Sequence, residues 1–282
     1  MSKADLHIHS CYSDGSDTIP ELAEKIKNAG IEIFALTDHD TIAGCKEMEQ
    51  IIDKSIKFIP SIELTCKADW VKCHILGYKC DYNNEKLLSL IEKGKELRRI
   101  KLETRINYLR DTWNIELTEE EKTWLYSRGS VVKTHIANIL VNRGLADDNV
   151  SAMKKYLDGC KSGDTRFTGE EAVDAIISAG GIPVWAHPLG GEGEVHISKE
   201  EFYKKFEVMK ALGIKGLECH YSRYTDEEAE FLVSVAKEKN LFITGGSDYH
   251  GTNKDIPLAK LNVENIPVST NSLTILKNLN LV

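Results

Sequence analysis

The stretch Ala4-Asp5-Leu6-His7-Ile8-His9, near the beginning of the chain, contains the pattern that decides the fold. Apolar residues alternate with polar ones, which is typical of a β-strand. Because alternate residues of a strand point to the same side, His7 and His9 can both face one ion. The stretch therefore predicts a strand that ends in two potential metal ligands.

Similar apolar runs recur along the chain, and amphipathic helical stretches separate most of them. We expect strands at residues 4–9, 33–37, 57–63, 71–77, 182–186, 216–219 and 241–244. Helices are expected at residues 20–29, 42–54, 199–212 and 226–239. This alternation predicts an α/β protein built as a parallel β/α barrel.

Between residues 81 and 170 the strand pattern gives way to apolar residues at helical spacing. We expect a discontinuous barrel of residues 1–80 and 171–282, interrupted by a helical insert or lid domain at 81–170. The insert contains a run of basic residues interleaved with glutamates, which we interpret as a solvated helix face. These basic residues are Lys93, Lys95, Arg98, Arg99, Lys101, Arg105 and Arg110.

The overall composition excludes several classes of protein. With 282 residues, of which 41% are hydrophobic and 28% charged, the chain is neither disordered nor fibrous. A net charge of -8 argues against a broad basic surface that coats nucleic acid. We expect a cytoplasmic protein without a membrane partner, because no long apolar stretch or signal peptide is found. The cysteines form no CxxC pair, which excludes a zinc ribbon.

Histidines and carboxylates gather where the expected strands end. In parallel β/α barrels these carboxyl ends meet on one face, where active sites lie. A single histidine on an apolar strand is more often a core residue, but six strand ends with the same residue types predict a metal centre. The residues at these six ends are His7, His9, His39, Glu63, His187, Glu218, His220, Asp248 and His250, and the strand expected at residues 71–77 carries His74.

The residue types and their number indicate which metals are bound. Imidazole and carboxylate groups are ligands of zinc, manganese and iron, whereas magnesium alone would prefer more oxygen ligands. About nine ligands exceed what a single ion can use. We therefore expect two to three divalent transition metals, Mn, Fe or Zn.

The order of these motifs resembles that of the PHP (polymerase and histidinol phosphatase) superfamily. The residues that carry the resemblance are His7-Ile8-His9, Ser13-Asp14-Gly15, Thr37-Asp38-His39-Asp40, Glu63, His74, Ala186-His187-Pro188 and Gly246-Ser247-Asp248-Tyr249-His250. Within it, the chain is similar to a branch that includes 3′,5′-nucleoside bisphosphate phosphatases and short-RNA 5′-exonucleases. The helical insert, His135-Ile136-Ala137 and Tyr221-Ser222-Arg223 support this placement.

The resemblance implies a distorted (β/α)7 TIM-like barrel with three metals. The implied ligands are His7, His9, Glu63 and Asp248 for the first ion, Glu63, His74 and His187 for the second, and Asp14, His39 and His250 for the third. Glu63, Asp248 and His250 are the expected catalytic members of this set. By sequence pattern alone, Asp14 would be interpreted as a turn or helix-cap residue.

The resemblance also implies a reaction. We expect a metal-dependent phosphoesterase that hydrolyses a phosphomonoester of a small nucleotide, such as a 3′,5′-bisphosphate, by metal-activated hydroxide. Alternatives are a 5′-exonuclease on short single-stranded RNA or DNA, a phosphatase similar to histidinol phosphatase, an amidohydrolase, and a structural metal-binding PHP module. We infer no obligate protein partner.

Several polar residues are left as candidates for supporting roles. Arg223 and Ser222 follow a strand end and are expected to contact substrate phosphate. His135 is either a core helix residue or a lid residue that contacts phosphate. Related sequences often have Gly-Arg-Pro before this histidine, where the chain has Val132-Lys133-Thr134. Asp38 and Asp40 either orient His39 or shape the turn, and Glu218 and His220 either support the ligands or face the substrate.

Overall fold

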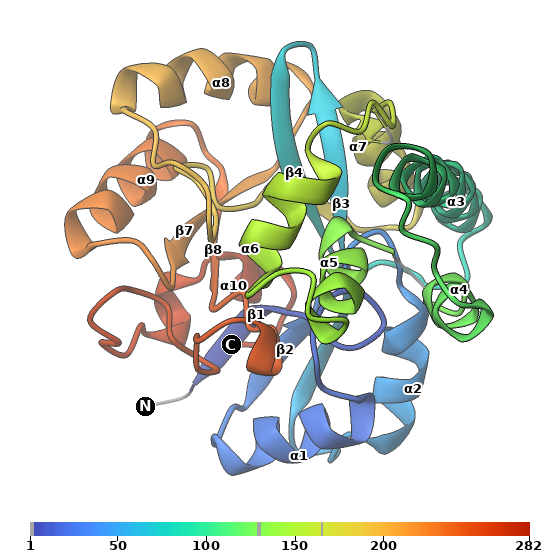
Figure 1. The fold of residues 1–282 in the computed structure, drawn as a ribbon. Helices are drawn as coiled ribbons and strands as arrows, with labels where there is room; N and C mark the ends of the chain where they lie inside the picture. Colours follow the sequence, from blue (N-terminus) through green and yellow to red (C-terminus); the bar gives the residue numbers. More distant parts are fainter. Residues whose placement is uncertain (1–2, 129–130, 165) are drawn as a thin grey trace. The chain divides into compact units, whose positions relative to one another are not determined.

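The computed structural model describes residues 3–128, 131–164 and 166–282 (Figure 1). The strands are β1 Ala4–Ile8, β2 Ile33–Leu36, β3 Lys57–Ala68, β4 Val71–Tyr78, β5 Phe167–Thr168, β6 Ile182–Trp185, β7 Gly216–Tyr221 and β8 Phe242–Gly246. The longer helices are α1 Ile19–Asn28, α2 Ala43–Ile51, α3 Glu85–Trp113, α4 Glu119–Tyr126, α5 Lys133–Asn142, α7 Gly169–Ser178, α8 Lys199–Ala211 and α9 Asp226–Glu238. Each strand expected from the sequence overlaps an observed strand, and β5 is an additional short one.

The main strands form one sheet in the order β1-β2-β3-β4-β6-β7-β8, whose two edges nearly meet. The backbone N–H of Asp248 donates to the carbonyl of His7 at 2.8 Å, and that of His9 donates to the carbonyl of Tyr249 at 2.9 Å. These hydrogen bonds join the residues after β8 to β1 and nearly close the sheet into a barrel. The α/β barrel class predicted from the sequence is therefore confirmed.

Strand β4 runs antiparallel to both of its neighbours, β3 and β6, so the expectation of an all-parallel barrel is wrong here. The reason is a tight turn at Asp69 and Trp70, since Ala68 already pairs with Val71. Asp69 has a φ of 50°, in the left-handed region that such turns use. The reversal brings His74, in the first half of β4, to the barrel end where the parallel strands finish.

The helices beside the site begin at well-formed caps. In α1, Thr18 and Glu21 form a capping box, and Thr225 and Glu228 form another in α9. In such a box the hydroxyl and the carboxylate each accept a backbone N–H, which stabilises the helix start by about 1 kcal/mol. The caps thus fix the ends of the loops that precede α1 and α9.

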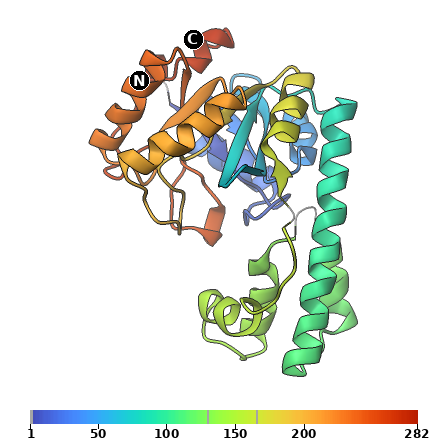
Figure 2. The same cartoon turned by 90° about the horizontal axis from the view of Figure 1, so that it is seen from above.

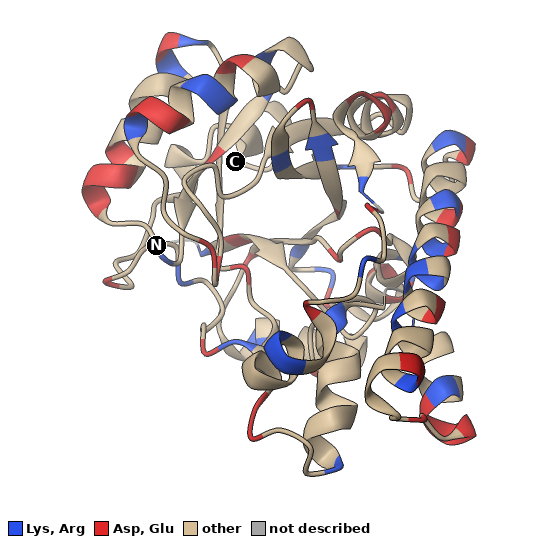
Figure 3. Ribbon diagram, turned by 45° about the horizontal axis from the view of Figure 1, so that its top comes forward, with Lys and Arg blue, Asp and Glu red and all other residues tan. Residues whose placement is uncertain are grey.

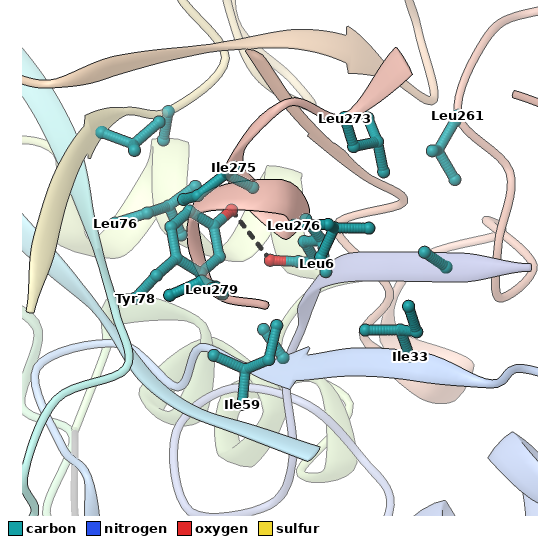
Figure 4. Close-up of a cluster of buried hydrophobic side chains, with 14 residues drawn as sticks. Leu6, Ile33, Ile59, Leu76, Tyr78, Leu261, Leu273, Ile275, Leu276 and Leu279 are labelled. Carbon is teal, nitrogen blue, oxygen red and sulfur yellow. Dashed lines mark hydrogen bonds between the residues drawn. The ribbon is translucent and has the colours of Figure 1, made fainter. Parts of the chain in front are cut away.

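A buried apolar cluster connects the strands to the C-terminal segment (Figure 4). Leu6 of β1 and Tyr78 of β4 pack there with Leu273, Ile275 and Leu276. The hydroxyl of Tyr78 donates to the carbonyl of Leu6 at 3.0 Å, which satisfies this polar group among apolar side chains. The cluster holds β1 and β4, which carry His7 and His74, in one rigid arrangement.

The chain divides into two compact units, Met1–Leu90 with Phe167–Val282, and Ile91–Arg166. The second, here called the insert unit, contains most of the continuous helix α3 together with α4, α5 and the short helix α6 (Asn149–Ala152) (Figure 2). It has a core of its own, formed by residues such as Leu109, Leu125 and Leu140. Among the described residues, no helix is both long and apolar enough to cross a membrane.

Candidate metal centre

Glu63, in the middle of β3, is fully buried and lies among five histidines. A parallel bridge between His39 and Glu63 connects β3 to the loop after β2. The Glu63 Oε2 atom lies 3.2 Å from Nε2 of His7, Nε2 of His9 and Nδ1 of His39, and Oε1 lies 3.2 Å from Nδ1 of His74 and 3.3 Å from Nε2 of His187. A single carboxylate thus contacts ring nitrogens of five histidines from four parts of the barrel: β1 and the residue after it, the loop after β2, β4, and the loop after β6.

A second group of ligand-type atoms forms around Asp14. Its Oδ1 atom lies 3.1 Å from Nε2 of His250 and 3.7 Å from Nδ1 of His9, and its Oδ2 atom lies 3.8 Å from Nε2 of His39. These four residues each offer one ligand atom, and the four atoms lie within 4.8 Å of one another. The loop before α1 therefore brings Asp14 into the same centre as the strand-end histidines.

The aspartates beside His39 shape the surrounding loops. Asp38 accepts hydrogen bonds from the backbone N–H and the hydroxyl of Ser10, at 2.8 and 2.7 Å. It thereby anchors the loop that presents Asp14. Asp40 adopts a left-handed φ of 52° and accepts from the backbone N–H of Thr65 at 2.7 Å. Both residues thus hold backbone segments in place around the centre.

Several buried polar atoms of this centre lack hydrogen bonds within the described part of the chain. They are Nε2 of His9, Oδ1 of Asp14, Nδ1 of His39 and Nε2 of His250. Buried polar atoms rarely remain without partners, because their desolvation is then uncompensated. A divalent cation would satisfy these nitrogen and oxygen donors. Because His9, His39 and Glu63 each belong to two of the three candidate ligand groups, the residues fit a multi-metal site.

Asp248, directly after β8, presents one oxygen to the histidines and the other to the barrel wall. Its Oδ2 atom accepts hydrogen bonds from the Tyr221 hydroxyl at 2.7 Å and from Nζ of Lys254 at 2.8 Å. Its Oδ1 atom lies 3.6 Å from Nε2 of His7, 3.3 Å from Nε2 of His9 and 3.4 Å from Nδ1 of His250. The carboxylate is therefore oriented by residues that sequence reasoning did not assign to it.

The backbone at Asp248 leaves the extended conformation of β8. Its φ is 59°, in the left-handed region, so the chain turns at Asp248 and does not run extended to His250. The His250 ring instead folds back, with Nδ1 2.8 Å from the carbonyl oxygen of Asp248. The two side chains converge through a tight turn.

Glu218 lies fully buried on β7 and supports two of the histidines. Its Oε1 atom lies 2.8 Å from Nδ1 of His7, and its Oε2 atom accepts the backbone N–H of His187 at 2.7 Å. His220, by contrast, lies among the residues of a separate cavity lined by α9 and by Ile243 of β8. Of the two candidates on this strand, Glu218 is the one in contact with the centre.

Burial and mutual charge shift the pKa values in opposite directions. Burial would raise the pKa of Glu63, but His39 and His7 hold it well below its usual range. Burial would lower the pKa of His9, but the carboxylates of Asp248 and Glu63 beside its ring raise it to about 9. For His39 burial dominates and lowers the pKa to about 4. The carboxylates thus stay ionised and stabilise positive charge inside the site, either on a histidine such as His9 or on a metal ion.

Arg223 and Ser222 follow β7. The Arg223 Nη1 group donates to the carbonyl of Gly191 at 2.7 Å, and its Nε lies 3.3 Å from Oε2 of Glu192. The guanidinium therefore ties down the glycine-rich loop after His187. The Ser222 hydroxyl is buried and has no hydrogen-bond partner among the described residues.

His135 belongs to the insert unit, where it lies in the first turn of α5. It is buried, its Nδ1 atom accepts the backbone N–H of Val132 at 3.2 Å, and its ring meets that of Trp124 edge-on at 5.7 Å. Its local role is therefore to cap the helix, and a contact with phosphate stays a prediction.

Comparison with known proteins agrees with this geometry. Residues 5–165 match the model of the PHP domain. The chain belongs to the PHP domain family. A 5′-3′ exoribonuclease from Haemophilus influenzae is 31% identical over 252 residues, covering 88% of this chain and 90% of that protein.

Two further proteins extend the comparison. A 3′,5′-nucleoside bisphosphate phosphatase from Chromobacterium violaceum is 26% identical over 254 residues, covering 89% of this chain and 88% of that protein. A solved structure from Bifidobacterium adolescentis, described as a metal-dependent phosphoesterase, superposes with a TM-score of 0.76. It is 24% identical, and the match covers 96% of this chain and 98% of that one. The fold class and the enzyme class, a metal-dependent PHP phosphoesterase, are confirmed.

Proposed function

We propose that this PHP phosphoesterase works with two to three divalent transition metals, Mn, Fe or Zn. The observation that carries the proposal is Glu63, whose carboxylate lies within 3.3 Å of ring nitrogens of five histidines. A carboxylate in that position is suited to bridge two ions. The proposed ligands are His7, His9, Glu63 and Asp248 for one ion, Glu63, His74 and His187 for a second, and Asp14, His39 and His250 for a third.

The side chains around the ligands would keep the centre ready for phosphate. When bound, divalent ions lower the pKa of water toward neutrality and polarise phosphoryl oxygens. Glu218 holds the ring of His7, and Tyr221 and Lys254 hold Oδ2 of Asp248, so that Oδ1 faces the histidines. Glu63, Asp248 and His250 are the proposed catalytic members. No side-chain nucleophile is needed in this reaction.

The proposed substrate is a small nucleotide with more than one phosphate, such as a 3′,5′-bisphosphate. The relative from Chromobacterium violaceum, named for this activity, supports that class. One phosphate would be hydrolysed at the metals and the other would need a separate cationic contact. We propose Arg223 and Ser222 for this contact, because a guanidinium binds phosphate through two hydrogen bonds and a buried hydroxyl without a partner among the described residues can donate a third. His135, which belongs to the insert unit, is proposed separately as a residue that contacts substrate phosphate.

A second candidate is removal of nucleotides from the 5′ end of short RNA. The 31% identical relative from Haemophilus influenzae carries the name of that activity. The two substrates share their chemistry, since the first nucleotide of a 5′-phosphorylated RNA also has phosphate at both its 5′ and 3′ oxygens. The metal centre described above suits either.

Side-by-side assays test the proposal. The full chain, loaded with manganese, would be supplied with adenosine 3′,5′-bisphosphate, a 5′-phosphorylated oligoribonucleotide and histidinol phosphate. We expect the highest kcat/KM for the bisphosphate, or for the oligoribonucleotide if the second candidate holds. A clear preference for histidinol phosphate would reject the substrate class. Elemental analysis showing at most one metal per chain would reject the multi-metal assignment.

A further inference from the structure

Helix α3 carries basic side chains on more than one face, and Figure 3 shows positive and negative residues mixed along it. Lys95 pairs with Glu92 at 2.6 Å, while Arg99 contacts Glu96 at 2.9 Å and Glu103 at 2.5 Å. The Arg99 side chain is 51% exposed. These residues form a solvated face whose charges are already balanced.

Lys101 and Arg105 lie one helical turn apart on α3 and are partly buried. The segment at residues 159–160 lies against α3 beside them. The Cys160 thiol donates to the carbonyl of Thr104 at 3.9 Å, and a Cβ atom at Gly159 would lie 2.4 Å from the Tyr108 hydroxyl. This segment covers that part of α3, which is why the two basic side chains are only partly exposed to water.

Two further cations lie beside Lys101 and Arg105. Burial raises the pKa of the Cys160 thiol, whereas the positive charges of Arg105, Lys133 and Lys101 lower it. All three cations therefore lie close to this thiol. Burial also lowers the pKa of Lys101, and Arg105 and Arg166 lower it further. We call Lys101, Arg105, Lys133 and Arg166 the basic cluster; all belong to the insert unit.

Two acidic residues, Asp158 and Asp164, lie beside the four cations of the basic cluster, and Asp164 also acts on Lys101. Lys133 pairs with Asp158, and Arg166 pairs with Asp164 at 2.7 Å. In the described part of the chain, Arg105 makes no hydrogen bond and no ion pair. The Arg105 guanidinium is only partly buried, and its nitrogens are not among the buried polar atoms without a partner, so they are open to water or to an anionic ligand.

An exposed aromatic ring belongs to the same unit as the basic cluster. Trp124 of α4 is 39% exposed and contacts the ring of His135, two residues after Lys133 in the first turn of α5. The guanidinium of Arg128 lies 5.3 Å from the Trp124 ring. Proteins that bind single-stranded nucleic acid combine basic side chains along the backbone with aromatic rings on which bases stack.

We propose that the basic cluster binds the phosphodiester backbone of a short single-stranded RNA. The inference deepens the proposed function and rests on its nucleotide chemistry. Because the whole chain carries a charge of -8, attraction of a polyanion must come from a local excess of positive charge such as this one. The cluster distinguishes an oligonucleotide from a mononucleotide, since the latter has no phosphates beyond those at the metal centre.

The test compares two faces of the same helix in the full, metal-loaded protein. The variant Lys101→Gln with Arg105→Gln removes two charges from the basic cluster, and Lys95→Gln with Arg99→Gln removes two from the solvated face. The probe is a labelled, 5′-phosphorylated six-nucleotide RNA with phosphorothioate linkages, followed by fluorescence anisotropy from 50 to 200 mM KCl. We expect at least fivefold weaker binding for the cluster variant, and a salt slope smaller by about 1.4 for two lost contacts.

The control variant on the solvated face should bind within twofold of the wild type. Equal effects of the two double variants would overturn the proposal. Lys133→Gln, at an exposed ion pair, provides a second variant if the double variant folds poorly, and unchanged binding in it would also contradict the proposal.

A kinetic comparison separates this inference from the proposed function. The loss of kcat/KM in the cluster variant should be at least fivefold larger for a six-nucleotide RNA than for adenosine 3′,5′-bisphosphate. Equal losses would overturn the proposal, because the cluster would then hold the small nucleotide. Absence of metal-dependent turnover on every phosphate ester would instead reject the proposed function, while the anisotropy data would still decide whether the cluster binds RNA.

Discussion

The Oε1 atom of Glu218 lies 2.8 Å from the Nδ1 atom of His7, 211 residues earlier in the chain. The contact leaves Nε2 of the same ring facing Glu63 at 3.2 Å. Carboxylates placed behind a histidine in this way orient the ring and make it a stronger ligand. The position of Glu218 therefore connects β7 to the metal centre at β1.

The variant Glu218→Gln is expected to bind metal more weakly, by about 10- to 100-fold, because the ring of His7 loses its anionic partner. Titration of metal-free protein with Zn²⁺ or Mn²⁺ measures the effect. Glu227→Gln, at an exposed position of α9, is the matched control and should bind as the wild type does. Equal affinity in the two variants would show that Glu218 has no supporting role.

Replacement of the central carboxylate should be more damaging. Glu63→Gln keeps the shape of the side chain but removes the charge that five imidazoles approach. We expect the loss of at least one metal per chain and a fall in turnover of about a thousandfold, since metals stabilise the transition state by several kcal/mol. Elemental analysis and phosphate release measure both effects. Near-normal turnover would contradict the bridging role.

Metal binding should release protons at neutral pH. In the metal-free protein, burial would lower the pKa of His9, but Asp248 and Glu63 raise it to about 9, so the ring is protonated at pH 7. A metal ligand must be neutral, and affinity should therefore increase as the pH rises toward 9. Calorimetric titrations at pH 7 in two buffers of different ionisation enthalpy count the released protons. A count of zero would contradict this prediction.

The same shift predicts how the stability of the metal-free protein depends on pH. A histidine whose pKa is raised from 6.5 to about 9 in the folded state stabilises that state fully below pH 6.5. This contribution is lost as the pH rises through 9. Urea unfolding of the metal-free protein at pH 6, 7.5 and 9 should show decreasing stability, and His9→Gln should flatten the dependence.

Arg223→Ala tests the proposed substrate contact. A charge-assisted bond to the phosphate that does not react is worth about 1.5 to 3 kcal/mol, or about ten- to a hundredfold in kcat/KM. The loss should be seen with a 3′,5′-bisphosphate and be much smaller with an aryl phosphate, which has a single phosphate. Equal losses would mean that the contacts of Arg223 with Gly191 and Glu192 matter more than the substrate.

Gly246→Ala should destabilise the barrel where β8 meets β1. A Cβ atom at Gly246 would lie 2.2 Å from Cβ of His7 and 2.4 Å from its backbone nitrogen. The backbone cannot move aside locally, so we expect a loss of about 1 to 3 kcal/mol in the free energy of unfolding. Urea denaturation measures it, and an unchanged midpoint would show that the two strands can separate without cost.

The strand ends were predictable because the signals are local. His7 and His9 alternate with apolar residues, and His187 follows a short apolar run, so each could be placed without knowing the fold. Glu63 was expected at a strand end but lies in the middle of β3, because pairing with β4 extends that strand to Ala68. The direction of β4 was not predictable in this way. Its turn, Asp69-Trp70, lacks the Asn-Gly or Asp-Gly pair that usually indicates a tight hairpin.

The sequence by itself determined the barrel class and the residue types of the metal centre, because periodicity and ligand chemistry can be seen in neighbouring residues. Its resemblance to the PHP superfamily implied the phosphoesterase class. The tertiary structure alone decided that Lys254 and Tyr221 orient Asp248, and that the segment at residues 159–160 lies against α3 at Thr104. These relationships depend on contacts between segments far apart in the chain, or on which side of a helix another segment covers. Packing establishes them, and no local pattern encodes them.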